Sequence, residues 1–249
     1  MAEPADRPVL SAAAMLGDRV LPLPARAVVV FDESHVPKRR RRRDPAPFRR
    51  IALAGSDGDV AVVATVGPGG PTAAVTIEFL AHLGVSVVIA VGVAGDLHGV
   101  GNTDRRGAGP LPVSAAVAED GTSVRYGSHQ PGATLDADAR LVAALVEATG
   151  EAPVVAVSTD TPLRHGKADI TRFRQSARLV EMETAALLAA GDRCAVRVGA
   201  LLVPSDGYHT TDDGPVWSAA DQKLVKPSVT VAVHTAIAVL AAEPPVAPS

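Results

Sequence analysis

Two glutamates that lie two positions apart stand at the start of a predicted helix. The run Val180-Glu181-Met182-Glu183-Thr184 precedes the apolar stretch Ala185 to Ala190. Residues two apart do not share a helix face, so the two carboxylates point in different directions. A carboxylate can hold two neighbouring hydroxyls of a sugar and strengthen its grip as positive charge develops on the ring. We predict that role for Glu183; the alternative is that both glutamates favour the positive end of a helix.

A glycine-rich turn joins a predicted strand to a predicted helix. Residues 65–72 read Thr-Val-Gly-Pro-Gly-Gly-Pro-Thr and contain Gly67, Gly69 and Gly70, with Pro71 in the first helical turn. Unpaired backbone N–H groups at such a helix start can bind an anion or a strongly polar ligand. The spacing is neither a Walker A loop nor a dinucleotide fingerprint, so a tight packing turn is the alternative.

A serine and an aspartate, Ser205-Asp206, follow the apolar run 195–203. An aspartate at the end of a buried strand can protonate a leaving group if its surroundings let it carry a proton. The neighbouring hydroxyl of Ser205 would then orient the carboxyl group. The alternative is that Asp206 caps the Gly207-Tyr208 turn.

Together with residues 85–95, these segments resemble the nucleoside phosphorylase superfamily, which includes uridine phosphorylase, hexameric purine nucleoside phosphorylase and methylthioadenosine nucleosidase. The resemblance covers about residues 27 to 242. Residues 67–80 are similar to the Gly-x-Gly-Gly-Pro-Ser…Glu-Glu-Leu signature. Val180 to Thr184 matches the ribose-binding Val-Glu-Met-Glu, and Ser205-Asp206 matches the Ser-Asp of the purine-cleaving branches.

The resemblance assigns roles at the nucleoside end of the site. It implies that Glu181, Met182 and Glu183 hold the ribose and that Asp206 protonates or hydrogen-bonds N7 of a purine, oriented by Ser205. Gly92 and Gly95, in the turn from Ala90 to Gly95, are further candidates for substrate contact.

The base is only partly defined by the sequence. Uridine phosphorylases read uracil with a glutamine and an arginine after the fourth core strand. The corresponding segment, residues 160–167, contains Arg164 but no glutamine. We therefore favour a purine and keep Arg164 as a candidate for substrate binding.

The phosphate ligands of the phosphorylases are missing. Their first strand runs into Gly-Asp-Pro-x-Arg and their third ends in Arg-Ile-Gly-Thr-Thr-Gly, whereas this chain has Phe31 to His35 and Ala90 to Gly95 at those places. A buried phosphate needs charge-assisted donors to offset its lost hydration. The nucleosidase branch uses water and also lacks these arginines, so Glu33 or His35 is a candidate for positioning water.

An arginine tract, Arg39 to Arg43, lies in the predicted basic loop 38–47. A solvated loop, a contact with polyanions and a role at the active site are all open. Phosphorylases of the superfamily receive one phosphate-binding arginine from a neighbouring subunit, on the segment before the second strand. Arg49 and Arg50 fall closest to that place, and the resemblance implies a homo-oligomer, either a dimer or a hexamer.

Three functions are consistent with these residues. The leading one is cleavage of the N-glycosidic bond of a nucleoside by phosphorolysis, which gives free base and pentose 1-phosphate. Hydrolysis by water is the second, and a non-catalytic nucleoside-binding relative is the third. We expect neither a metal nor an organic cofactor, because no His/Cys/Asp cluster has ligand spacing; inorganic phosphate is a co-substrate in the first case.

Valine-rich apolar runs alternate with helical patterns along the chain. We expect strands at 27–31, 60–65, 85–91, 153–158 and 195–203 and helices at 72–83, 137–149, 183–190 and 228–243. This alternation predicts an α/β fold: a single three-layer domain with a central, largely parallel mixed sheet flanked by helices.

Glycines mark the expected ends of several elements. Gly84, Gly150 and Gly191 are candidate helix stops, and Asp120-Gly121 predicts a hairpin within 111–126. We expect an N-terminal extension at 1–26, the phosphorylase-like domain at 27–243 and a disordered tail at 244–249.

Composition limits the class of protein. The chain has 249 residues, of which 47% are hydrophobic and 3% aromatic, so alanine, valine and leucine must build the core. A formal net charge of −3 gives no basic footprint for nucleic acid. No run reaches the roughly 18 apolar residues of a membrane span. There is no signal-peptide pattern, and the single Cys194 suits a reducing compartment, so we expect a cytoplasmic protein that binds neither nucleic acid nor membrane.

Overall fold

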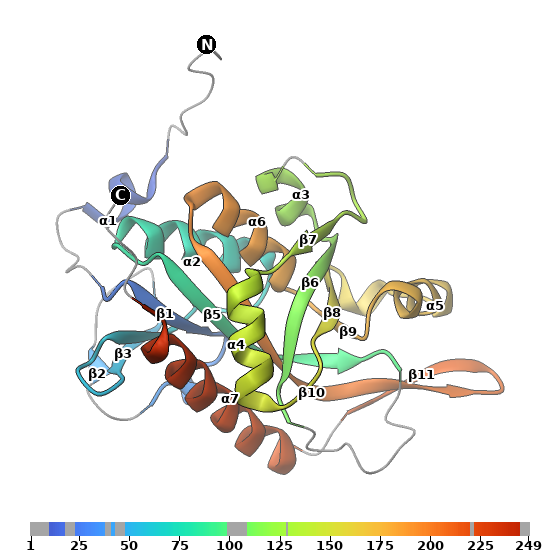
Figure 1. Cartoon of the computed structure of the whole chain (residues 1–249). Helices are drawn as coiled ribbons and strands as arrows, with labels where there is room; N and C mark the ends of the chain where they lie inside the picture. The colour runs from blue at the N-terminus through green and yellow to red at the C-terminus, as the bar shows by residue number, and fades with distance from the viewer. Residues whose placement is uncertain are drawn as a thin grey trace.

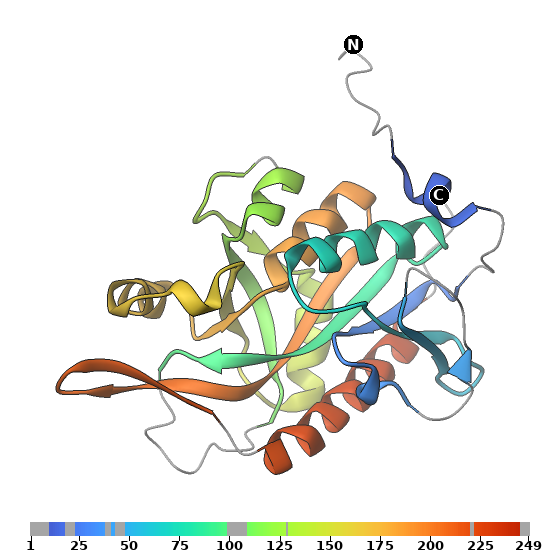
Figure 2. The same cartoon turned by 180° about the vertical axis from the view of Figure 1, so that it is seen from behind.

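The computed structural model describes residues 10–17, 23–37, 41–42, 48–98, 109–127, 129–219 and 222–244. All eleven strands of these residues belong to one mixed sheet, with helices on both of its faces (Figures 1 and 2). The strands are β1 (Arg26–Val30), β2 (Arg41–Arg42), β3 (Arg50–Ala54), β4 (Val60–Ala64), β5 (Val87–Asp96), β6 (Leu111–Glu119), β7 (Thr134–Asp136), β8 (Val154–Thr159), β9 (Leu179–Glu181), β10 (Arg197–Thr211) and β11 (Gly214–Ala219). The helices are α1 (Ala12–Leu16), α2 (Gly70–His82), α3 (Gly121–Gly127), α4 (Ala139–Thr149), α5 (Lys167–Ser176), α6 (Thr184–Cys194) and α7 (Gln222–Ala242), with 3-10 turns η2 (Glu33–His35) and η4 (Pro162–Arg164).

The centre of the sheet is parallel. Strand β1 pairs in parallel with β4 on one side and β5 on the other, and β5 pairs in parallel with β10. Alternate residues of β1 enter different cores: Ala27 and Val29 pack toward α2 and α6, whereas Val28 and Val30 pack toward α7. Burial on both faces explains why the strands are almost entirely apolar. The predicted three-layer α/β fold is confirmed.

The predicted hairpin at Asp120-Gly121 is wrong. Strand β6 runs to Glu119, and the chain then enters α3 instead of turning back into a strand. Asp120 is buried, and its side chain accepts hydrogen bonds from the backbone N–H of Ser123 at 2.7 Å and from the Ser123 hydroxyl. An aspartate that binds the N–H three residues later starts a helix, which is why the same residue pair does not form a turn here.

Gly191 does not end a helix, contrary to the sequence prediction. Helix α6 continues to Cys194 and ends at Ala195, which has φ 56°. A Cβ on Gly191 would lie 2.6 Å from Val198 Cγ2 and 2.8 Å from the Val196 carbonyl oxygen. The glycine therefore lets α6 approach β10 closely. Gly150, in contrast, has the left-handed conformation at the end of α4, as predicted.

Segments at the predicted boundaries are only partly described. Within the predicted extension 1–26, Leu16 and Leu23 are buried in the core that α2 and α6 cover. Of the basic loop 38–47, Arg41–Arg42 forms β2 and pairs antiparallel with β3, and the other residues lie outside the described part of the chain. Residues 245–249 of the predicted tail also lie outside it.

Helix α7 is long and apolar enough, by length and composition alone, to cross a membrane. Some of its apolar side chains, however, form a stripe against the sheet: Val225, Val229, Val233, Ala236 and Leu240 are buried in the core below β1, β4 and β5, whereas Leu224 and Val231 are exposed. A core helix passes the same test of length and composition. The packing therefore accounts for the hydropathy of α7 without a membrane.

Candidate active site

A cavity of about 240 Å³ lies where several strands of the sheet end. Ligands of open α/β sheets bind beyond the carboxyl ends of the parallel strands. Among the predicted site residues, the lining contains Gly95 at the end of β5, Glu181, Met182 and Glu183 between β9 and α6, and Ser205 and Asp206 on β10. The predicted sugar and base residues thus face one space.

The carboxylate of Glu181 supports the start of α6. It is buried and accepts the backbone N–H groups of Glu183 and Thr184, both at 2.8 Å, and the hydroxyl of Ser158. The Ser158 oxygen in turn accepts the N–H of Ala185 at 2.8 Å. Glu181 and Ser158 together thus satisfy three free N–H groups at the start of the helix, two on the carboxylate and one on the hydroxyl oxygen. Glu181 therefore fixes the position of its neighbour Glu183.

Glu183 connects the helix start to the glycine-rich turn. Its Oε1 accepts the backbone N–H of Gly69 at 2.6 Å. Gly69 has φ 106°, a conformation that favours glycine. The glycines therefore do not act alike: the Gly69 N–H binds a carboxylate, Gly70 packs against Asp120 and Thr122, and Gly67 has open space around it. Of the three, none lines the cavity, although the intervening Pro68 does.

The two buried glutamates retain a proton between them. Burial and the negative charge of the nearby Glu181 together raise the pKa of Glu183 to about 8, against the N–H groups of Gly69 and Met182, which lower it. Burial also raises the pKa of Glu181, against the effect of its three donors. Because the donors to Glu181 stabilise its anion, we assign the proton to Glu183.

Asp206 lies directly after an irregularity in β10. Pairing with β5 shifts register between Pro204 and Asp206, so Ser205 is an extra residue on that strand. Bulges of this kind redirect side chains and are frequent at active sites. The Ser205 hydroxyl donates to Asp206 Oδ1 at 2.7 Å, and the indole N–H of Trp217 donates to Oδ2 at 2.6 Å. Trp217 was not among the predicted site residues. The sequence pattern that could have indicated it is the Asp212-Asp213-Gly214 turn, which is typical of a hairpin.

His165, and not its neighbour Arg164, lines the cavity after β8. Arg164 is exposed on η4 and does not reach the other predicted residues. The His165 Nε2 lies 2.9 Å from the Thr159 hydroxyl, and its Nδ1 is buried without a partner among the described residues. Burial lowers the pKa of His165, which favours the neutral imidazole. A neutral ring can both donate and accept a hydrogen bond.

A second cavity of about 500 Å³ adjoins the first and shares Phe31, Pro68 and Val93 with it. Its lining includes Asp32, Ser34 and His35, which follow β1, together with Gly92 of β5 and Lys226 of α7. Of these, His35 and Gly92 were predicted. Asp32 accepts the N–H of Ser34 at 2.7 Å, which lowers the pKa of its carboxyl group. Burial lowers the pKa of His35, although Asp32 opposes this shift. This space has the location predicted for the acceptor.

The arginines predicted to replace the missing phosphate ligands lie outside the linings of both cavities. Arg49 and Arg50 both form ion pairs with Glu33, each at 3.6 Å. Glu33, Arg49 and Arg50 line neither of the two adjoining cavities. Among the described lining residues of the second cavity, Lys226 is the one permanent cation. Lys226 lies in α7, which is separated from β1 by almost the whole length of the chain, so no local sequence pattern could identify it as a lining residue.

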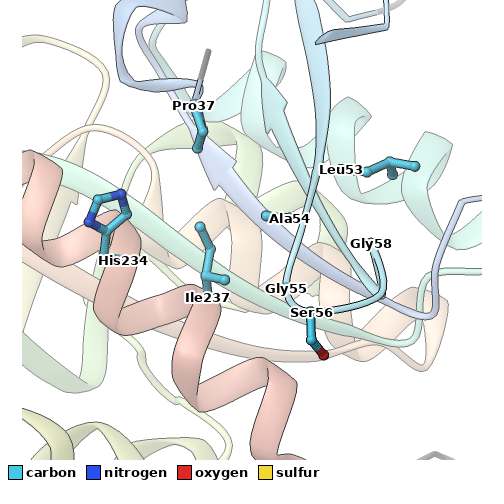
Figure 3. Close-up of a pocket in the computed structure, with 8 residues that line it drawn as sticks. All are labelled: Pro37, Leu53, Ala54, Gly55, Ser56, Gly58, His234 and Ile237. Carbon is cyan, nitrogen blue, oxygen red and sulfur yellow. The ribbon is translucent and has the colours of Figure 1, made fainter. Parts of the chain in front are cut away.

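A larger cavity of about 560 Å³ lies between the β3–β4 turn and α7 (Figure 3). Its lining is Pro37, Leu53, Ala54, Gly55, Ser56, Gly58, His234 and Ile237. His234 is its one titratable group, and no predicted site residue reaches it. Among the described residues, no group of three or more His, Cys, Asp or Glu side chains could hold a metal ion. We therefore place the site at the two adjoining cavities.

The proton on Glu183 makes stability depend on pH. Because the folded pKa lies near 8 and the ordinary value is 4.5, the folded state binds more protons between these pH values, and its stability falls as pH rises. We expect the free energy of unfolding of the wild type to fall relative to Glu183→Gln by up to about 1.4 kcal/mol per pH unit. Urea unfolding of both proteins at several pH values between about 5 and 8 measures this difference in the free energy of unfolding. Glu147→Gln, exposed on α4, is the control; parallel curves for the wild type and Glu183→Gln would contradict the assignment.

Comparison with known proteins identifies the family. The family model described as "Phosphorylase superfamily" matches residues 25–242. A guanosine phosphorylase of Halorubrum lacusprofundi is 30% identical over 156 residues, which are 61% of this chain and 63% of that protein, so the match spans less than two thirds of the relative.

Two solved structures share the fold. A purine nucleoside phosphorylase of Toxoplasma gondii, in complex with immucillin-H, has a TM-score of 0.69 and 18% identity over 87% of this chain and 91% of its own. A uridine phosphorylase of Vibrio fischeri has a TM-score of 0.69 and 17% identity over 89% and 93%. The match of the family model over residues 25–242 shows that the chain belongs to the phosphorylase superfamily.

Proposed function

We propose that this enzyme cleaves the N-glycosidic bond of a purine nucleoside by phosphorolysis, giving free base and pentose 1-phosphate. The observation that carries the proposal is the joining of two spaces. One has Glu183 and Asp206 in its lining, and the adjoining one has Lys226 and His35. The similarity to a guanosine phosphorylase supports phosphate as acceptor and a purine as base.

Glu183 acts at the sugar. Its carboxylate holds the ribose diol, and its charge becomes more favourable as the bond from C1′ to the base lengthens and the ring becomes positive. The buried position keeps this charge poorly screened, so its effect on the transition state is large. Binding of the diol must displace the proton that the free enzyme keeps on Glu183.

Asp206 acts at the base. The electron pair of the broken bond moves onto the purine, and a proton on Asp206 passes to N7 to neutralise it. The Ser205 hydroxyl, 2.7 Å from Oδ1, orients the carboxyl group. His165 lines the same cavity, and its Nδ1 is buried without a partner among the described residues.

Phosphate attacks from the adjoining space. One phosphate oxygen bonds to C1′ as the base leaves, and Lys226 supplies the positive charge that the missing family arginines would have supplied. The negative charge of Asp32 repels the phosphate anion, so the interactions of phosphate with His35 and Lys226 must be stronger than this repulsion. Hydrolysis remains the second candidate because Asp32 and His35 in that space could bind and activate water.

We further propose that two copies associate. A groove of about 730 Å³ between α1 and α2 exposes Met15, Val66 and Val75, with Phe48 and Arg49 also in its lining. Exposed apolar side chains gathered over one face are typical of a protein interface. A symmetric pair would cover this groove and set Arg49 against the second copy.

Replacing Lys226 tests the acceptor. We expect Lys226→Ala to raise the KM for phosphate at least roughly 10-fold, because a charge-assisted hydrogen bond is worth about 1.5–3 kcal/mol. Initial rates of base release against phosphate concentration measure this. Lys223→Ala removes the same charge one turn earlier on α7, outside the cavity lining, and is the control. Equal effects of both changes would contradict the assignment, and phosphate-independent release of free pentose would replace phosphorolysis by hydrolysis.

Replacing Asp206 tests the proton donor. Asp206→Asn keeps the shape of the side chain but removes its proton, so kcat on guanosine should fall by about 10²-fold or more. 7-Methylguanosine has a cationic base that leaves without a proton, and we expect a much smaller loss on it. Base release from both substrates measures the difference. If both rates fell equally, Asp206 would have a structural role only.

Light scattering tests association. We expect the wild type to be a dimer or a higher symmetric assembly and Val66→Glu to shift it toward the monomer, because a charge cannot be buried in an apolar interface without a partner. Val231→Glu places the same charge on the outer face of α7, where Val231 is exposed, and should leave the assembly unchanged. A fully active wild-type monomer at micromolar concentration would rule this proposal out.

A further inference from the structure

The indole of Trp217 binds the carboxylate that the proposed reaction uses. Its Nε1 donates to Asp206 Oδ2 at 2.6 Å, while the Ser205 hydroxyl donates to Oδ1 at 2.7 Å. We propose that Trp217 is a positioning residue that keeps Oδ2 unprotonated, so that the proton of Asp206 is carried by Oδ1 and directed at the base. This inference rests on the proposed function.

The β10–β11 hairpin determines the placement of the indole. Asp206 pairs with Ala219, and Tyr208 pairs with Trp217, so these four side chains lie on the same face of the hairpin. Diagonal neighbours on adjacent strands are within reach of an aromatic side chain. The hairpin projects from the body of the sheet beside α5 (Figure 1). Its register therefore brings Trp217 to Asp206 from outside the cavity, which Trp217 does not line.

The chemistry of the indole decides which oxygen carries the proton. An indole N–H is a donor only, so a proton on Oδ2 would set two donors against each other. A serine hydroxyl can donate or accept, so the Ser205 hydroxyl is compatible with a proton on Oδ1. A Cβ on Gly95 would lie 3.3 Å from Oδ2, so this oxygen is also close to the end of β5. Oδ2 is thus enclosed by Trp217 and Gly95, whereas Oδ1 contacts the Ser205 hydroxyl, which can adapt to a proton.

Packing does not explain the position of Trp217. The residue is 56% exposed, so burial contributes little to holding the ring in place. An exposed tryptophan whose polar end is bound to an active-site carboxylate is better explained by that hydrogen bond. Trp217 is also the only tryptophan in the chain, so intrinsic tryptophan fluorescence reports on this position alone.

The kinetic test separates the hydrogen bond from the ring. Trp217→Phe keeps an aromatic side chain and removes the N–H. We expect kcat on guanosine to fall roughly 10-fold, the effect of losing one hydrogen bond to a charged group. The KM for guanosine and the kcat on 7-methylguanosine should stay within about 2-fold, because neither depends on proton transfer from Asp206. Val216→Ala, on the opposite face of the hairpin, is the control and should change none of these values.

Two kinetic results would overturn the inference. Equal losses on guanosine and 7-methylguanosine would mean that Trp217 only stabilises the hairpin, and unchanged kcat on both would mean that it does not position Asp206. Circular dichroism and urea unfolding of each variant show whether it is folded, so that a loss is not assigned to unfolding.

Fluorescence tests the inference without turnover. Hypoxanthine that binds to Oδ1 changes the hydrogen bonding of Asp206 beside the indole, so we expect a saturable change in wild-type emission that is absent in Asp206→Ala. Absence of the change in the wild type would overturn the inference. If the wild type cleaves neither nucleoside with or without phosphate, the proposed function fails. The emission change then decides separately whether Trp217 senses a base at Asp206.

Discussion

Burial of two carboxylates side by side is the constraint on which the rest of the site depends. Glu181 and Glu183 lose their hydration together, and the surrounding chain offers backbone N–H groups in return. Those donors come from the start of α6 and from the turn before α2, so the two helix starts are held at one place. The Ser158 hydroxyl adds the end of β8 to this arrangement. The proposed sugar-binding group is therefore supported by three separate segments.

The same constraint gives the carboxylate of Glu183, for which we propose ribose binding, two states. In the free enzyme Glu183 keeps a proton and accepts the Gly69 N–H, and a bound diol replaces part of that environment. The turn conformation at Gly69 favours glycine, so the turn and the carboxylate act as a unit. Substrate binding at the sugar is thereby linked to the turn that borders the acceptor space through Pro68.

The proposed acceptor space has charged residues other than those that the family resemblance implies. The fold still provides a space beside the sugar, at the ends of β1 and β5. The loops after those strands carry Asp32, His35 and apolar residues, and a cation arrives from α7 instead. Electrostatic support depends on the position of a charge and not on the element that carries it. Lys226 can therefore act where strand-end arginines are missing.

Local patterns in the sequence determined the α/β fold and the parallel centre of the sheet, and they predicted residues that line one cavity, because burial and helix starts leave a signal in nearby residues. Tertiary structure alone decided the long-range partners. Glu33 pairs with Arg49 and Arg50, Trp217 binds Asp206, and Lys226 enters a space formed by β1. These contacts depend on strand register, on a one-residue bulge and on helix packing, which no spacing within one segment encodes.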